Sequence, residues 1–318
     1  MELGFWLSCE EHRPDTLVEQ AVTAEEVGFG FALASDHLHP WVPAQGQAPF
    51  VWAVLGAAAH ATSRITLGTG VSSPIHRIHP VLLAQAASTV AAMAPDRFVL
   101  GLGLGERLNE HVVGGHFPRP GVRRRMLVEA IDIIRPLLAG EDVDHEGEFF
   151  TVEHARLYTR PASPPDIWLA IAGPRTARLA AEKCDGMIGL APQAAQVQAF
   201  ETAGGTGKPV VGQLHICLAA SIDAAVATTR RWWPQQALPG ALLPELARPE
   251  HFAAAIQLVT DQGLRDAVIC CDSPQPVLEA IAAFAGAGFT HVAVHQVGPD
   301  QERLFEVARD ELLPALHG

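Results

Sequence analysis

The sequence predicts a single α/β domain folded as a (β/α)8 TIM barrel with two insertions. Short runs rich in Val, Ile, Leu and Phe alternate with longer Ala-rich amphipathic stretches, a pattern typical of repeated βα units around a parallel sheet. Eight such runs suit a closed barrel better than a doubly wound open sheet, which more often has about five or six strands. The length of 318 residues also exceeds the roughly 250 of a simple barrel and leaves room for insertions.

The predicted strands and helices follow one another in the expected order. The strands are Leu3–Leu7, Phe29–Ala34, Ile65–Thr69, Phe98–Leu102, Ile167–Ile171, Gly186–Gly189, Val210–Ile216 and Thr290–His295. The helices are Thr16–Glu26, Pro49–Ala61, Pro80–Met93, Arg123–Leu138, Pro174–Cys184, Gln193–Thr202, several segments within Ile222–Leu258, Pro274–Ala285 and Asp300–Leu313.

Two segments interrupt this alternation. Residues 143–158 place Gly147 between two alternating stretches, which predicts a β-hairpin inserted after the fourth unit. The stretch Pro234–Pro249 is irregular, and it predicts a helical insertion over residues 222–258 that acts as a lid or an oligomer contact. Because no low-complexity linker separates the units, we expect residues 1–318 to form one domain.

Composition and charge exclude several classes of protein. With 22 basic and 35 acidic side chains, the net charge of −13 repels nucleic acid and anionic membranes. No uncharged apolar run reaches the roughly 20 residues of a membrane span, and the first residues do not resemble a signal peptide. Five cysteines without a C-x-x-C motif argue against a disulfide framework or a structural zinc site. We therefore expect a cytoplasmic protein that acts on a small molecule and binds no metal.

Polar residues and glycines follow the predicted strands at their carboxyl ends, where the active site of a (β/α)8 barrel lies. They are Ser35-Asp36-His37 with Trp41 after the second strand, the segment 68–74 after the third, the segment 101–110 after the fourth, Ala172-Gly173-Pro174 after the fifth and His295 at the end of the eighth. We expect these residues to meet at one rim.

Three side chains of this rim suggest acid–base chemistry near a ring-shaped ligand. His37 could act as a base, and the carboxylate of Asp36 beside it could hold the imidazole and raise its basicity. Glu106 directly follows a glycine turn, where an exposed carboxylate can act on a ligand. Trp41 could pack over a ring. Taken alone, His37 equally fits a core or capping histidine, and the glycines equally fit a tight turn from strand to helix.

Four motifs carry a resemblance to a known family. They are Ala34–Trp41 (ASDHLHPW), Gly68–Val71 (GTGV), Gly103–Glu110 (GLGERLNE) and Ala172–Pro174 (AGP). Together they resemble the luciferase-like superfamily of flavin and deazaflavin oxidoreductases, and more narrowly the branch of the F420-dependent glucose-6-phosphate dehydrogenases. The resemblance extends over nearly the whole chain.

The resemblance implies a luciferase-like barrel, a homodimer, and the deazaflavin coenzyme F420 bound at the carboxyl rim. It assigns catalysis to His37, Glu106 and Trp41, and a carboxylate that reaches the substrate sugar to Glu10. It also implies a cis peptide bond between Gly70 and Val71. The residues that would contact the cofactor are Asp36, Gly70, Val71, Gly103, Leu104, Gly105, Ala172, Gly173 and Pro174, with the cofactor phosphate at the backbone of Gly173.

The chain departs from this branch at two positions that bind the substrate phosphate. The sugar-phosphate dehydrogenases carry a lysine where this chain has Gln193, and the segment that supplies a second lysine reads Phe252–Thr260, without any cation. A phosphate dianion needs fixed positive charge to offset its loss of hydration. We therefore expect a neutral alcohol, aldehyde or unphosphorylated sugar as substrate. An FMN-dependent oxidoreductase or monooxygenase, or a flavin-binding relative without turnover, are the alternatives.

Overall fold

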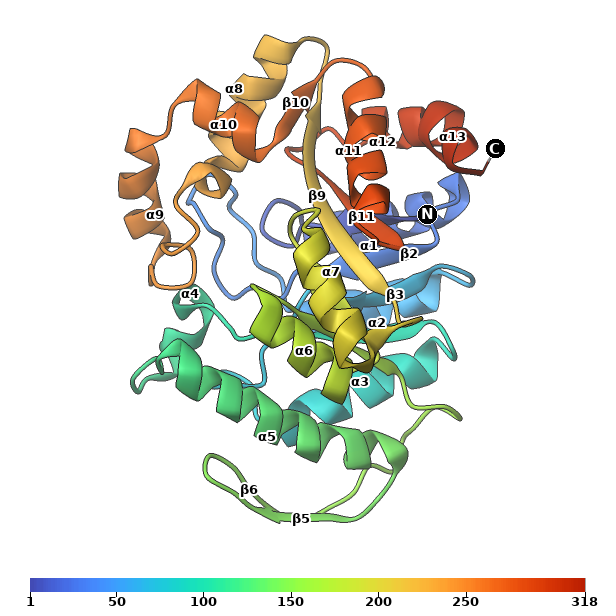
Figure 1. Ribbon diagram of the computed structural model, residues 1–318, viewed down its shortest axis with the longest axis vertical. Coiled ribbons are helices and arrows are strands. Elements are labelled where there is room, and N and C mark those ends of the chain that lie inside the picture. The colour runs from blue at the N-terminus through green and yellow to red at the C-terminus, as the bar shows by residue number, and fades with distance from the viewer. Residues whose placement is uncertain (318) are drawn as a thin grey trace.

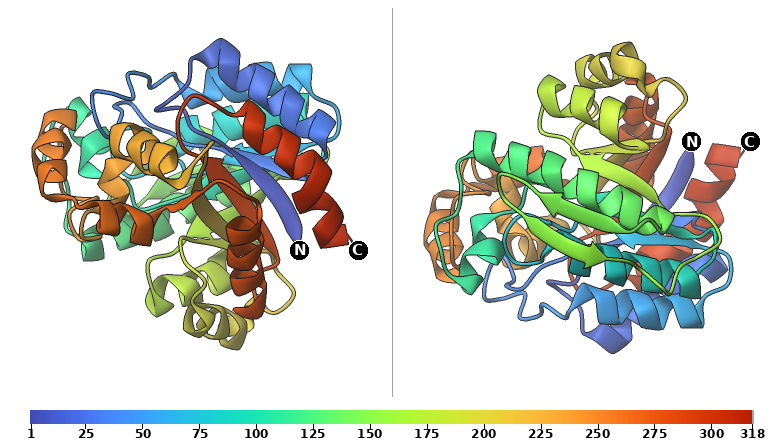
Figure 2. Two further views of the ribbon diagram at one scale, coloured as in Figure 1. Left: turned by 90° about the horizontal axis from the view of Figure 1, so that it is seen from above. Right: turned by 90° about the horizontal axis from the view of Figure 1, so that it is seen from below.

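The computed structural model describes residues 1–317, and it has eight parallel strands that close into a barrel (Figures 1 and 2). Around the barrel the order is β1-β2-β3-β4-β7-β8-β9-β11, and β11 pairs with β1 to close the ring. Their bounds are β1 Glu2–Leu7, β2 Phe31–Ala34, β3 Thr66–Thr69, β4 Phe98–Leu102, β7 Asp166–Ala170, β8 Gly186–Gly189, β9 Val210–Leu218 and β11 His291–Gln296. The predicted (β/α)8 barrel is confirmed.

Helices cover the outside of the barrel (Figure 2). They are α1 Pro14–Val27, α2 Val51–Ala61, α3 Pro80–Met93, α5 Pro120–Ala139, α6 Pro174–Lys183, α7 Ala194–Phe200, α8 Ile222–Trp232, α11 Gln275–Gly286, α12 Glu302–Val307 and α13 Leu313–His317. Two helices begin at a proline a few residues before the predicted start, namely α1 at Pro14 rather than Thr16, and α5. Thus α5 begins at Pro120 rather than Arg123, because proline at the first helical position has its φ already set and needs no N–H partner.

The barrel interior is apolar in its lower part and polar near the carboxyl rim. Trp6, Phe31, Trp168 and Val211 belong to one buried cluster inside the ring of strands. Because side chains alternate along a strand, Ser8 and Ser35 continue the inward positions of Trp6 and Leu33. His215 and His295 continue those of Val211 and Ala293 in the same way. The strands therefore place a layer of hydroxyl and imidazole groups directly beneath the rim.

The segment that we expected to form a hairpin contains two antiparallel strands, β5 (Val143–Glu146) and β6 (Thr151–Ala155). It lies outside α5, at the lower edge of Figure 1. The carboxylate of Glu129 on α5 accepts hydrogen bonds from the backbone N–H groups of Phe149 and Phe150 at 3.1 and 2.8 Å. These bonds fasten the hairpin to the helix.

The second insertion extends further than we predicted. After α8 the chain forms α9 (Pro249–Ala255), α10 (Asp261–Ala267) and a short strand β10 (Ile269–Cys271). Strand β10 pairs with Ile216–Leu218, the last residues of β9. Strand β9 therefore ends two residues beyond its predicted end at Ile216. The insertion lies over the carboxyl rim, and the loop before α9 reaches α4 (Arg107–Glu110), where the Arg107 N–H donates to the Pro244 carbonyl at 3.0 Å (Figure 1). Among the helices of residues 1–317, none is long and apolar enough to cross a membrane.

Candidate active site

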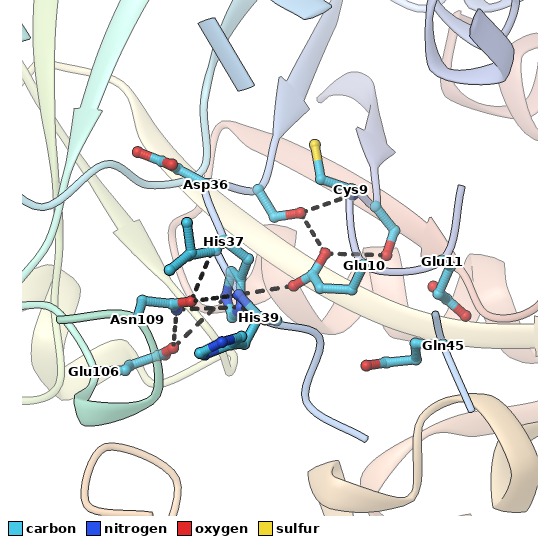
Figure 3. Close-up of polar contacts among 12 residues, drawn as sticks. Cys9, Glu10, Glu11, Asp36, His37, His39, Gln45, Glu106 and Asn109 are labelled. Atoms are coloured by element: carbon cyan, nitrogen blue, oxygen red, sulfur yellow. Dashed lines mark hydrogen bonds and ion pairs between the residues drawn. The ribbon is translucent and has the colours of Figure 1, made fainter. Parts of the chain in front are cut away.

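His37 lies between two carboxylates at the carboxyl rim (Figure 3). Its Nε2 is 3.3 Å from Oε1 of Glu10 and 3.6 Å from Oε2 of Glu106. Its Nδ1 lies 3.1 Å from the carbonyl oxygen of His39 and 3.2 Å from the side-chain amide nitrogen of Asn109. With a hydrogen on Nδ1 donated to the His39 carbonyl, Nε2 is free to take a proton, and the carboxylate of Glu10 would stabilise the resulting imidazolium.

Glu10 belongs to the turn after β1 and is buried. Its Oε2 accepts hydrogen bonds from the hydroxyl groups of Ser35 and Ser8, so that Oε1 is directed to His37. The family resemblance assigned Glu10 to the substrate, whereas the structure places its carboxylate against the imidazole. A contact between Glu10 and substrate stays a prediction.

Asp36 does not hold the imidazole of His37, and this expectation was wrong. Its Oδ1 accepts a hydrogen bond from Nη2 of Arg77 at 2.6 Å, and its Oδ2 accepts one from the hydroxyl of Ser72 at 2.6 Å. The Asp36 side chain is fully buried. Consecutive residues of an extended segment point in opposite directions, so Asp36 ties β2 to the loop after β3 while His37 faces the rim. The Glu10 carboxylate and the His39 carbonyl have the orienting role that we gave to Asp36.

Trp41 covers His37 on the side of the insertion. The two ring centroids are 4.9 Å apart, and the planes are inclined by 52°. The indole also packs edge-on against Phe252 of α9, with 5.3 Å between centroids. Trp41 is 8% exposed, so it forms an apolar wall between the imidazole and the insertion.

Asn109 and Glu110 of the segment 106–110 also take part in the site, although neither was predicted to have a role there. The side-chain oxygen of Asn109 accepts hydrogen bonds from the backbone N–H groups of Leu38 and His39, at 2.9 and 3.3 Å. Its amide nitrogen lies 3.4 Å from Oε2 of Glu106. The spacing of three residues between Glu106 and Asn109, which places both on one side of a helical turn, was the available signal.

Glu110 supports the site from below. Its carboxylate accepts hydrogen bonds from the backbone N–H groups of His76 and Arg77, at 3.0 and 2.8 Å. These bonds hold the loop after β3, whose Arg77 in turn holds Asp36. The segment 106–110 thus contributes carboxylates to two layers of the site.

Burial is the main cause that raises the pKa of Glu106 to about 7, and the neighbouring carboxylates of Glu10 and Glu110 contribute to this rise. His37 and Arg123 act in the opposite direction. Because the pKa is raised, the Glu106 carboxyl is largely protonated below pH 7 and ionised above it. Its side chain is 32% exposed and accessible to a ligand.

The predicted cofactor residues of the third and fourth loops lie together. The peptide bond between Gly70 and Val71 is cis, as the resemblance implied. Val71 packs against the backbone of Gly103, where a Cβ atom would come within 2.5 Å of its side chain. Gly105 has a φ of +67°, and its carbonyl accepts a hydrogen bond from the buried Arg123 at 2.9 Å. Leu104, between the two glycines, is partly buried.

The other predicted binding residues follow β7 and β8. Gly173 precedes α6, beside Ala172 and Pro174, and a Cβ atom at Gly173 would meet nothing within 4 Å. A helix N-terminus with open space before it suits the phosphate of a cofactor. Gln193 is exposed and precedes α7, where its side-chain oxygen accepts a hydrogen bond from Gln196 at 2.6 Å.

Nothing in residues 1–317 brings three or more His, Cys, Asp or Glu side chains together in a way that could hold a metal ion. The side chain of His79 accepts a hydrogen bond from the backbone N–H of Val81 at the start of α3. Nε2 of His76 lies at hydrogen-bond distance from the carbonyl of Gly114.

A closed (β/α)8 barrel with a histidine held between two carboxylates at its carboxyl rim defines an enzyme site built for proton transfer. Comparison with known proteins identifies the family. The model of the luciferase-like monooxygenase family matches residues 1–291, and the chain belongs to this family.

Curated relatives and solved structures give narrower similarities. The chain is 32% identical to an F420-dependent glucose-6-phosphate dehydrogenase of Kribbella flavida, over 99% of this chain and 98% of that protein. It is 34% identical to one of Nakamurella multipartita, over 99% and 96%. A solved F420-dependent secondary alcohol dehydrogenase in complex with an F420-acetone adduct matches with a TM-score of 0.91 and 28% identity, covering 99% of this chain and 98% of that one. The resemblance found in the sequence is confirmed.

Proposed function

We propose that this protein is an F420-dependent oxidoreductase that transfers a hydride between the deazaflavin and a neutral alcohol or unphosphorylated sugar. The observation that carries the proposal is the position of His37, whose Nε2 faces the rim between Glu10 and Glu106. The names of the curated relatives and of the alcohol dehydrogenase structure support the cofactor. When bound, the deazaflavin would supply the acceptor or donor of the hydride.

Each residue of the site has a distinct task in this reaction. Nε2 of His37 takes the hydroxyl proton of the alcohol while the carbon-bound hydrogen leaves as hydride. Glu10 is buried, its Oε2 accepts hydrogen bonds from two serine hydroxyls, and its carboxylate stabilises the imidazolium. Glu106 in its protonated form donates a hydrogen bond at the rim. Trp41 keeps water away from the imidazole.

The rim has hydrogen-bond donors that suit a cofactor with a ring and a phosphate. The Ser73 hydroxyl is buried without a hydrogen-bond partner beside Gly105, and a ring edge with polar atoms would satisfy it. The backbone at Gly173 would hold the phosphate. Gly70, Val71 and Gly103 would form the surface on which the ring lies. We also propose a homodimer, and sedimentation of the purified protein tests this part.

The choice of cofactor gives a first prediction. We expect the protein to bind F420 more tightly than FMN, and to bleach the absorbance of oxidised F420 when a secondary alcohol is added. Titration of the protein with each cofactor, followed by fluorescence, measures the two affinities. Micromolar binding of FMN without detectable binding of F420 would replace this proposal by that of an FMN enzyme. Binding of F420 without turnover on any alcohol or sugar would indicate a relative that does not catalyse.

The raised pKa of Glu106 gives a second prediction. If the protonated carboxyl is the active form, kcat/KM for alcohol oxidation falls about tenfold per pH unit above pH 7. The amide of the Glu106→Gln variant cannot ionise, so we expect this variant to lack the fall in kcat/KM above pH 7. Glu250→Gln, which changes an exposed carboxylate on α9, serves as the matched control and should leave the profile unchanged. An alkaline limb that persists in Glu106→Gln would assign it to another group.

A further inference from the structure

The turn after β1 carries a second buried carboxylate, Glu11, directly beside Glu10. In Figure 3 the Glu11 side chain lies on the far side of Glu10 from His37. Its Oε2 is 2.7 Å from Nε2 of His295, and its Oε1 accepts a hydrogen bond from the backbone N–H of Gly298 at 2.9 Å. The carboxylate–histidine pair of the catalytic site thus has a counterpart built from the adjacent residue.

This second pair continues to a third group. Nδ1 of His295 lies 2.8 Å from Nδ1 of His215, and the two histidines are opposite each other in the pairing of β11 with β9. The side chains of Glu11 and His295 are 0% and 1% exposed. Trp233 packs edge-on over His295, with 4.3 Å between centroids. The three groups therefore form a buried chain, and His215, which is 8% exposed, stands at the end away from Glu11.

With a single hydrogen on each imidazole ring, the hydrogen-bond geometry allows two arrangements of protons along this chain. With Glu11 ionised, His295 donates from Nε2 to the carboxylate, and His215 donates from Nδ1 to Nδ1 of His295. With Glu11 protonated, the carboxyl donates to Nε2 of His295, which donates from Nδ1 to Nδ1 of His215. One proton added at Nε2 of His215 converts the first arrangement into the second. Each histidine gains one N–H and loses one, and the proton gained by the carboxylate changes the charge of the chain from −1 to 0.

The groups that face Glu11 decide where the added proton rests. The pKa of Glu11 is raised to about 7, mainly by burial and to a lesser extent by Glu10, while His12, the Gly298 N–H and the Ser8 hydroxyl act to lower it. Burial lowers the pKa of His295 to about 4. The pKa of His215 is also lowered by its burial and by His295. The proton therefore rests on the carboxyl, and each histidine keeps a single hydrogen.

Two contacts connect this chain to the catalytic pair. The Ser8 hydroxyl donates to Oε2 of Glu10 at 3.3 Å and also lowers the pKa of Glu11. The turn itself is closed by the backbone bond from the Glu11 N–H to the Ser8 carbonyl at 3.2 Å. Fixing Glu11 to β11 therefore fixes the backbone from which Glu10 reaches His37.

We propose that Glu11, His295 and His215 are positioning residues for the catalytic pair, joined in one buried chain that shares a single exchangeable proton and holds the turn carrying Glu10. Its effect on activity rests on the proposed function of Glu10 and His37. The arrangement of protons within the chain does not, and it can be measured on the protein alone.

Nitrogen-15 NMR of histidine-labelled protein tests the chain directly, because ring nitrogens with and without hydrogen have distinct chemical shifts. At pH 9 we expect His295 to carry its hydrogen on Nε2 and His215 on Nδ1. At pH 5.5 both should have changed to the other nitrogen. In Glu11→Gln the introduced amide accepts from Gly298 with its oxygen and donates to His295, so the second arrangement should persist at both pH values. Tautomers that do not respond to pH or to Glu11→Gln would overturn the proposal.

Activity measurements test the positioning role. We expect Glu11→Ala to lower kcat about ten- to a hundred-fold with KM nearly unchanged, as is typical for removing a group that orients a reactive histidine. Glu11→Gln retains the bond to Gly298 and should restore kcat to within about threefold. Glu2→Gln is the matched control, because Glu2 pairs with His291 at the opposite ends of the same two strands, at 3.2 Å. Wild-type kcat in Glu11→Ala would overturn the proposal. A wild-type enzyme without activity on any alcohol would contradict the proposed function, and the tautomers would still decide on the chain.

Discussion

Replacing His37 by alanine is expected to lower kcat by a factor of about 10² to 10⁴ while the affinity for F420 changes by less than about threefold. The imidazole is the group between Glu10 and Glu106 that can take up the hydroxyl proton, and its loss leaves two carboxylates facing each other. The cofactor, in contrast, rests on backbone and apolar surfaces such as Gly70, Val71 and Gly103. Steady-state kinetics between pH 6 and 9 and a fluorescence titration measure the two effects.

The matched control for this experiment is His116→Ala. His116 is exposed, so its removal should change neither kcat nor cofactor binding. Addition of free imidazole should partly restore the turnover of His37→Ala, because a small base can enter the space left by the side chain. Wild-type turnover of His37→Ala over the whole pH range would return His37 to the role of a capping residue.

The second expected result concerns substrate charge, and it predicts a lower kcat/KM for glucose 6-phosphate than for a simple secondary alcohol. A charge-assisted hydrogen bond to phosphate contributes about 1.5–3 kcal/mol, so each missing lysine costs one to two decades of affinity. In this chain Gln193 occupies one of the lysine positions, and α9 presents the buried Phe252 to Trp41. Arg77, which could have compensated, is bound to Asp36. A panel of glucose 6-phosphate, glucose and secondary alcohols measures the preference.

Two lysine substitutions, one directly before α7 and one within it, test whether a positive charge at position 193 itself favours the phosphate. Gln193→Lys should raise kcat/KM for glucose 6-phosphate about tenfold and leave that for a neutral alcohol unchanged. Gln198→Lys adds the same charge at an exposed position of α7 and should have no such effect. Saturation of the wild-type enzyme by low micromolar glucose 6-phosphate would show that another cation replaces the missing lysines.

The fold could be predicted from the sequence because each strand of the barrel is a local apolar run followed by an amphipathic helix. Strand β10 could not be, since it has three residues and forms only because β9 extends beyond the barrel to pair with it. The prediction that the insertion ends at residue 258 was wrong for the same reason, because the insertion continues to β10. Pairing between distant segments decides such elements, and periodicity within a short window does not report it.

The site residues were predictable as a set, whereas their partners were not. The motifs named His37, Glu106 and Trp41, and the barrel brings these three together. Neighbours in the sequence suggested that Asp36 orients His37, but successive side chains of an extended segment diverge. The actual partner, Glu10, follows β1, and the parallel pairing of β1 with β2 brings it beside His37.

The division of the site between the two halves of the barrel has a consequence for how such enzymes diversify. Glu10, His37 and Glu106 follow β1, β2 and β4, whereas Trp233 and Phe252 belong to the insertion after β9. Recombination that exchanges the second half of the chain would bring a new substrate wall to an inherited proton-transfer apparatus. The two halves must still keep the side-chain pairs that join them. Such pairs are Glu11 with His295, and Arg123 with Glu245 at 3.2 Å. A chimera that changes one member of these pairs without the other would keep its barrel and lose the alignment of its catalytic rim.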